Sequence, residues 1–110
     1  MKSIVITAAV ALSALAGAAQ AASTLTDNQF LQVARCRGLA ASEGLGKLDT
    51  ASIDQLLRAQ SQTRTLAVKA SANNKINAAT AQGDKAQGPK KDKLLAERQG
   101  DCATWLQAAQ

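Results

Sequence analysis

Two cysteines are the residues of this 110-residue chain whose chemistry is easiest to constrain. Cys36 lies between Arg35 and Arg37, and nearby positive charge lowers the pKa of a thiol and makes it more reactive. A redox site also needs a second thiol close by, and the chain has neither a C-x-x-C pair nor any cysteine besides Cys36 and Cys102. We therefore expect these two cysteines to form a structural disulfide.

A second group of reactive side chains lies in the densest run of positive charge, at residues 84–93. This run contains two carboxylates and four lysines: Asp84, Asp92, Lys85, Lys90, Lys91 and Lys93. It includes Gly88-Pro89, where a helix is expected to begin, and a helix N-terminus carries free amide donors and partial positive charge. Lysines are mildly unfavourable there, so one explanation is a bound phosphate or carboxylate. The alternative is a hydrated, flexible hinge.

Residues for catalysis are scarce. The chain has no His and no Tyr, two of the usual acid–base groups, and its only Met is Met1. Two carboxylate pairs are closely spaced, Asp49 with Asp54 and Glu97 with Asp101, but so small a helical domain is not expected to form a catalytic cleft. We expect a protein that is not an enzyme and has no cofactor and no metal site. Aromatic stacking platforms are also missing, so no specific nucleic-acid partner is expected.

The first 21 residues have the layout of a secretory signal peptide. Lys2 provides the positive end, residues 4–16 form an apolar run, and Ala19-Gln20-Ala21 is a small-x-small cleavage site. The run is shorter than the roughly 20 apolar residues that span a bilayer, and nothing later in the chain is apolar enough to do so. We expect cleavage after Ala21 and a periplasmic or secreted product of bacterial type.

Residues 22–110 then form one small domain. Removal of the signal also removes Lys2, which leaves 12 basic and 8 acidic side chains. Large apolar residues are few, and alanine supplies most of the hydrophobicity, so a marginal core is expected. In an oxidising compartment the disulfide offsets this weakness, because closing the chain between residues 36 and 102 is worth roughly 4 kcal/mol in the chain-entropy model.

The first helix is expected to begin after Thr26, because Thr26-Asp27-Asn28-Gln29 fits a capping box. The string Leu25-Thr26-Asp27-Asn28-Gln29 is also similar to the short LTxxQ motif of the periplasmic Spy/CpxP-like stress chaperones. The similarity covers five residues, and those proteins lack this cysteine pair, so it assigns no family.

Apolar periodicity predicts two further helices. One starts with Asp49 as N-cap and carries its apolar stripe to Val68, followed by a polar segment at 69–91 that is helical or flexible and lacks a core face. The other starts near Pro89, or with Asp92 as its N-cap, and continues to Ala109. No strand pattern is present, so the fold class is all-α, a three- or four-helix bundle with its first and last helices linked by the disulfide.

Function is less constrained than fold. The main hypothesis is a non-catalytic module of the cell envelope that acts through protein interaction, as a stress or chaperone-like factor. The alternative is a binder of anionic envelope polymers or lipid head groups through Lys85, Lys90, Lys91 and Lys93. Trp105 follows Cys102 by three residues, so we expect it to pack near the bridge, or else to face a partner. The partner's identity and the oligomeric state stay open.

Overall fold

The computed structural model describes residues 24–107, and the predicted signal peptide at 1–21 lies outside them. Five helices account for most of this part: α1 (Asp27–Ala41), α2 (Ala51–Ser61), α3 (Leu66–Lys85), α4 (Pro89–Gln99) and α5 (Ala103–Gln107). It contains no strand, so the prediction of an all-α fold is confirmed. None of the described helices is long and apolar enough to cross a bilayer.

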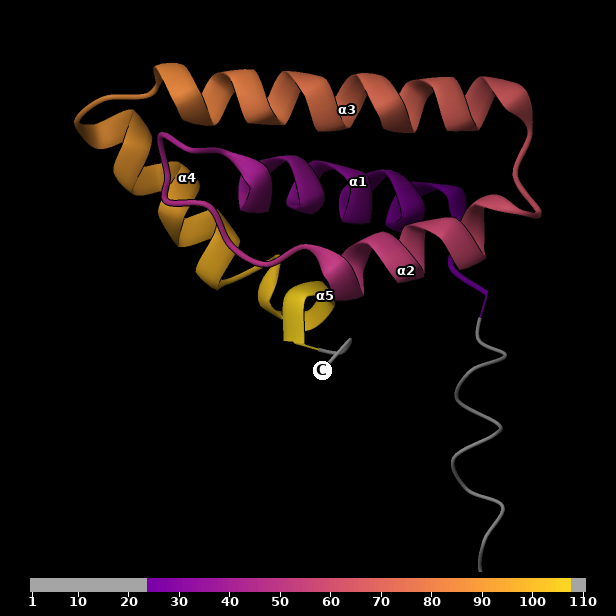
Figure 1. Ribbon diagram of the computed structural model, residues 1–110. Helices are drawn as coiled ribbons and strands as arrows, with labels where there is room; N and C mark the ends of the chain where they lie inside the picture. Colours follow the sequence, from indigo (N-terminus) through magenta and orange to yellow (C-terminus); the bar gives the residue numbers. More distant parts are fainter. Residues whose placement is uncertain (1–23, 108–110) are drawn as a thin grey trace, which may run out of the picture.

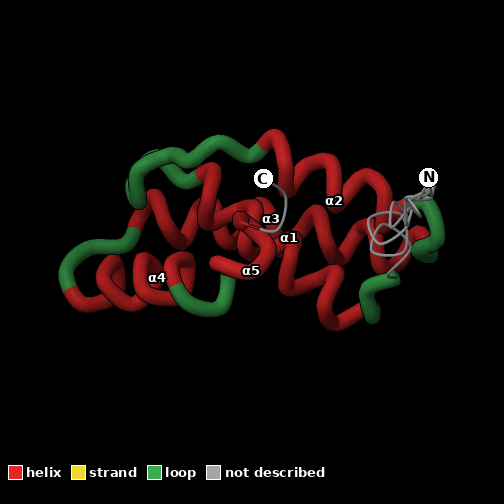
Figure 2. Tube along the Cα trace, turned by 90° about the horizontal axis from the view of Figure 1, so that it is seen from below, coloured by secondary structure: helices red, strands yellow, loops and turns green. Residues whose placement is uncertain are grey.

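Helix α1 is the centre of the fold. Helix α2 runs antiparallel to it on one side, and α3 runs parallel to it on the other (Figure 1). Helix α4 lies at the end of the molecule where α1 and α3 finish, and α5 turns back to lie beside α1 and the start of α2 (Figure 1). The connection from α1 to α2 runs along the outside (Figure 2). The α2–α3 turn is held by Arg64, which donates to Asp27 at 2.7 Å and to the Leu25 carbonyl.

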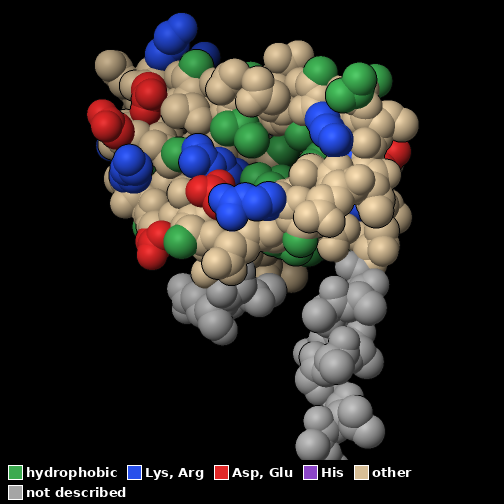
Figure 3. All heavy atoms as spheres, turned by 45° about the vertical axis from the view of Figure 1, so that its right-hand side comes forward, with side chains coloured by type: hydrophobic (Ala, Val, Ile, Leu, Met, Phe, Trp, Pro, Cys, Tyr) green, Lys and Arg blue, Asp and Glu red, His purple; other side chains and the backbone are tan. Residues whose placement is uncertain are grey.

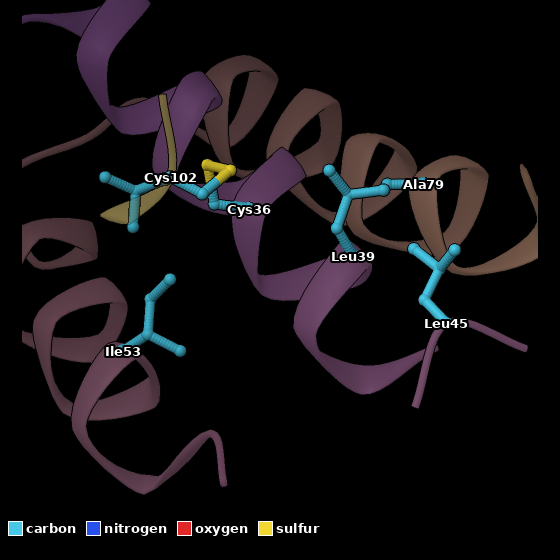
Figure 4. Close-up of a cluster of buried hydrophobic side chains, with 7 residues drawn as sticks. Cys36, Leu39, Leu45, Ile53, Ala79 and Cys102 are labelled. Atoms are coloured by element: carbon cyan, nitrogen blue, oxygen red, sulfur yellow. A yellow bond between two sulfur atoms is a disulfide. The ribbon is translucent and has the colours of Figure 1, made fainter. Parts of the chain in front are cut away.

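The predicted disulfide is present and buried. Cys36 on α1 is bridged to Cys102, immediately before α5, with a Cα–Cα distance of 5.4 Å. Both cysteines belong to the main cluster of buried side chains, together with Val33, Leu39, Leu45, Ile53 and Ala79 (Figure 4). The bridge thus joins the first helix to the start of the last one, as the sequence predicts.

Helix α3 differs from the expectation of a polar segment without a core face. It is the longest helix described and packs along α1, burying Ala72, Ala79 and Gly83. The reason is close approach: a Cβ atom on Gly38 would lie only 2.4 Å from the Ile76 carbonyl oxygen. Small residues bring the two backbones together, and the many van der Waals contacts that result stabilise the pair without large apolar side chains.

Helix boundaries confirm some capping predictions and correct others. Thr26 forms the predicted capping box with Gln29, and Pro89 is the first residue of α4. Asp49 is not the N-cap of α2, because that position is held by Thr50 while Asp49 accepts from the Ala51 amide at 2.9 Å.

Two predicted helices are each divided in the structure. The helix expected to run to Val68 ends at Ser61, and α3 begins separately because the Thr65 hydroxyl accepts from the Val68 amide. The helix expected from Pro89 onward is interrupted after Gln99. Gly100 follows at that point, and its low helix propensity explains the interruption.

Candidate functional site

A pocket with a volume of about 540 Å³ lies where α1, α3 and α4 meet. Its walls come from all three helices and from the α3–α4 connection. They carry four cationic side chains and one carboxylate, and the lining residues are Arg35, Gln82, Lys85, Ala86, Lys90, Lys93, Leu94 and Glu97. We call this the basic pocket.

A tight connection between α3 and α4 builds the basic pocket. Helix α3 ends at Lys85, where the Ala86 amide donates to the Gln82 carbonyl. Gly88 then adopts a φ of +59°, which favours glycine because other residues meet steric conflict there. Pro89 follows with a fixed φ and starts α4. The chain reverses within a few residues, so Lys90 and Lys93 line the same pocket as Lys85 at the end of α3.

Arg35 and Glu97 form a fixed ion pair in the pocket wall. Arg35 Nε donates to Glu97 Oε2 at 2.6 Å, and Nη2 donates to Oε1 at 3.0 Å. Its third nitrogen, Nη1, donates to Gln82 Oε1 at 3.1 Å, so one guanidinium joins α1, α3 and α4. The hydrogen bonds that Arg35 donates to Glu97 raise the pKa of Arg35, against the opposing effect of partial burial. The two charges compensate each other and hold the wall in one geometry.

The three lysines of the basic pocket have no such compensation. Lys85, Lys90 and Lys93 are exposed, and within residues 24–107 none of them forms an ion pair. With Arg35 balanced by Glu97, these lysines leave the pocket lining with a net charge of +3. The fourth lysine predicted from the sequence, Lys91, does not line the pocket.

Sequence reasoning missed the contribution of α1 to this site. The sequence alone draws attention to Arg35 only as a neighbour of Cys36, and to Glu97 only through its spacing from Asp101. A usable signal was nevertheless present, because a bridge between Cys36 and Cys102 must bring the residues beside each cysteine close together. The other carboxylate pair is also structural: Asp54 accepts from Arg37 at 2.8 Å and from Thr50 at 3.0 Å, and these bonds lower its pKa.

Trp105, the other residue singled out from the sequence, lies away from the basic pocket lining. It is half-buried and packs against the main cluster that contains both cysteines. This placement agrees with its expected position near the bridge.

A second concavity lies between α2 and α3, with α1 beneath it, and has a volume of about 250 Å³. Apolar atoms supply most of its lining surface, and the lining residues are Phe30, Leu57, Arg58, Ser61, Lys69, Ala72, Asn73 and Ile76. Figure 3 shows hydrophobic side chains gathered in a hollow of this side of the molecule, with Lys and Arg side chains near its edges. We call this the apolar groove.

Comparison with known proteins finds no matching family model, no similar curated protein and no similar solved structure. The five-residue LTxxQ-like string has a structural role here, because Thr26 and Gln29 form the capping box of α1. The two concave surfaces are therefore the features on which a function can be based.

Proposed function

We propose that this chain is an exported, non-catalytic binding protein that captures anionic groups in the basic pocket. The observation that carries the proposal is the convergence of Lys85, Lys90 and Lys93, all without an ion-pair partner in the described chain, on one pocket of about 540 Å³. The chemistry recognised is a phosphate or carboxylate, whether it belongs to an envelope polymer or to a lipid head group.

Pocket shape and charge support this proposal together. A concave surface lined by one sign of charge concentrates the electrostatic field and attracts counter-ions more strongly than the same charges spread over a flat face. Lysine ammonium groups are mobile point charges that suit anions of varied shape. Arg35 stays engaged with Glu97 and Gln82, so the three lysines are the groups free to reach a ligand.

The proposed location follows from residues 1–21 and from the disulfide. A buried disulfide between Cys36 and Cys102 is the kind of bond that persists in oxidising compartments. Together with the signal-like layout, it supports a periplasmic or secreted protein that meets anionic polymers and head groups of the envelope.

The test removes the three lysines and measures binding to two sources of the same anionic group. The pocket variant is Lys85→Gln/Lys90→Gln/Lys93→Gln. The control is Lys47→Gln/Lys75→Gln/Lys91→Gln, which removes the same charge from positions that do not line the basic pocket. Anionic-lipid vesicles, zwitterionic vesicles and soluble polyphosphate serve as probes at several salt concentrations.

We expect the pocket variant to bind roughly tenfold more weakly, since each exposed ionic contact contributes on the order of 0.5 kcal/mol. Its salt dependence should also be flatter, while the control variant stays close to the wild type. Equal losses in both variants would mean that net charge alone attracts the anion. Absence of wild-type binding at low salt would also contradict the proposal.

A second candidate function is binding to other proteins, as a stress or chaperone-like factor of the cell envelope. The observation that favours it is the apolar groove, which is separate from the basic pocket and shares no lining residue with it.

A further inference from the structure

We propose that the apolar groove between α2 and α3 docks a partner polypeptide through an apolar anchor side chain flanked by acidic residues. This inference rests on the second candidate function, the interaction module, and names the chemistry of its partner. It does not depend on anion capture in the basic pocket, because the two surfaces have no lining residue in common.

The groove exists because the bundle is open on this side. Helices α2 and α3 each pack against α1, but they make almost no contact with each other. The floor is therefore formed by Phe30 of α1 and Ala72 of α3, both buried, while Leu57 of α2 and Ile76 of α3 are half-buried along the walls. A seam that a fourth helix would cover in a closed bundle is left with apolar side chains facing an open hollow (Figure 3).

Its size favours side chains over a free small molecule. The volume of about 250 Å³ is below the usual range for small-molecule sites, about 300–1,000 Å³. One or two apolar side chains fit such a space. This is how helical peptides are recognised in grooves, where a few anchors on one face enter the hollow and the rest of the segment lies across the rim.

Charge on the rim determines which segment fits. Arg58 stands on the α2 wall and Lys69 on the α3 wall, and both are exposed. No carboxylate is among the lining residues, and neither cation forms an ion pair within the described residues. The nearest acidic influence is Asp54, one turn before Arg58 on α2. The hydrogen bonds that Asp54 accepts from Arg37 and Thr50 lower its pKa, and the Arg58 charge also helps to lower it. The remaining polar lining, Ser61 and Asn73, is neutral. A partner with one acidic residue on either side of its apolar anchor would complement both walls, whereas a basic segment would be repelled.

The recessed position of the apolar residues also separates this surface from a membrane-binding one. Phe30 is 2% exposed and Ala72 is 5% exposed, so a flat lipid surface cannot reach the floor, whereas a projecting side chain can. Vesicle binding that depends on Arg58 and Lys69 at the groove, rather than on the basic pocket, therefore counts against this proposal.

Peptide display on the intact, disulfide-bonded protein tests the inference. We expect enrichment of segments with Leu, Ile, Phe or Met as anchor and Asp or Glu within about one helical turn on either side. A synthetic peptide with the enriched pattern is then compared with two analogues, one with its anchor changed to Ala and one with its acidic residues changed to Lys. Fluorescence anisotropy gives the affinity of each.

Charge reversal locates the binding site. Arg58→Glu/Lys69→Glu should weaken the acidic peptide about tenfold or more, by replacing attraction with repulsion at two exposed contacts, and should strengthen the Lys analogue. Lys47→Glu/Lys75→Glu is the matched control, because it reverses two charges that do not line the groove. Circular dichroism confirms that each variant keeps its helices.

The outcomes separate this inference from the proposed anion site. The Lys85→Gln/Lys90→Gln/Lys93→Gln variant should bind the acidic peptide as the wild type does, whether or not it has lost anion binding. The inference is overturned if no acidic-flanked pattern is enriched, if both reversed variants bind equally, or if the Ala analogue binds as well as the parent peptide. Vesicle binding lost on reversal at the groove, without peptide binding, also overturns it.

Discussion

The close approach of α1 and α3 makes Gly38→Ala a sensitive test of the fold. A Cβ atom at position 38 would lie 2.4 Å from the Ile76 carbonyl oxygen and 2.7 Å from the Ala79 Cβ, whereas ordinary contacts begin near 3.4 Å. The two helices must therefore separate locally by about 1 Å. The first obstacle is backbone, so it cannot be relieved by turning a side chain, and a gap of this size forfeits a quarter to a half of each dispersion contact it opens.

Two opposing effects determine how much Gly38→Ala changes the free energy of unfolding. Overpacking costs typically about 1–3 kcal/mol, and the rigid obstacle places this site at the upper end. Replacing Gly by Ala inside a helix returns about 1 kcal/mol through helix propensity. We therefore expect Gly38→Ala to lower the free energy of unfolding by about 2 kcal/mol. For a domain of this size that corresponds to a midpoint lower by roughly 10 °C.

Urea unfolding followed by far-ultraviolet circular dichroism measures the change, and fluorescence of Trp105, the only Trp, gives a second probe. The control is Asn74→Ala, an exposed position on α3, which gains propensity without a new contact and should be stabilising by a few tenths of a kcal/mol. If Gly38→Ala were as stable as the wild type, α1 and α3 would not approach as closely as described, and the account of α3 as a core helix would be wrong.

Further predictions address the bridge, a buried cation, a carboxylate and the precursor. Reducing the Cys36–Cys102 disulfide should lower the free energy of unfolding by roughly 4 kcal/mol; superimposable urea curves with and without reductant would contradict this. Arg98→Met should cost about 3 kcal/mol, because Arg98 donates to three backbone carbonyls that would lose their donor, and an unchanged midpoint would refute it. Asp84 accepts from the Gly44 amide and the Ser42 hydroxyl, which lower its pKa. Its contribution is therefore complete above the unfolded value of about 3.9 and is lost as the pH falls through the lower folded value, so Asp84→Asn should flatten the acid limb of stability against pH. Intact mass of the exported protein should place its N-terminus at Ala22, and a mass that retains residues 1–21 would exclude cleavage there.

Local signals in the sequence predicted the parts of the fold that depend on neighbouring residues. Thr26 and Gln29 form a capping box within one turn, and Pro89 starts α4 because its ring fixes the backbone there. The disulfide was predictable because two cysteines allow only one pairing. The mistaken Asp49 cap shows the limit of such signals: Thr50 and Asp49 both have suitable oxygens, and their spacing alone does not choose between them.

Helix α3 could not be predicted as a core element from hydropathy. Its contact with α1 depends on Gly38, Ala79 and Gly83, residues with little or no side chain to bury. Hydropathy counts apolar side chains, whereas this interface is stabilised by the absence of side-chain bulk. A search for small residues at helical spacing, on both helices at once, would be needed to find it.

The candidate site was predictable only in part for a similar reason. Three of the four predicted lysines line the basic pocket, because they are close together in the chain around one turn. The Arg35–Glu97 pair joins residues 62 positions apart, and the choice of Glu97 over other carboxylates depends on the direction in which α4 leaves Gly88. Nothing in the sequence near Arg35 specifies that direction.

Parallel pairing of α1 with α3 also has a kinetic consequence. Two antiparallel helices can be joined by a short turn. Two parallel helices need a longer connection that brings the chain back to the starting end, and here α2 forms that connection between α1 and α3. Thr80 therefore meets the Gly38 carbonyl across 42 residues of chain, and Asp84 meets Ser42 across the same distance. Loop closure must precede these contacts, so this all-helical domain should fold more slowly than a simple up-and-down bundle of its size. During synthesis, the packing of α3 on α1 cannot be completed until the whole of α3 has left the ribosome.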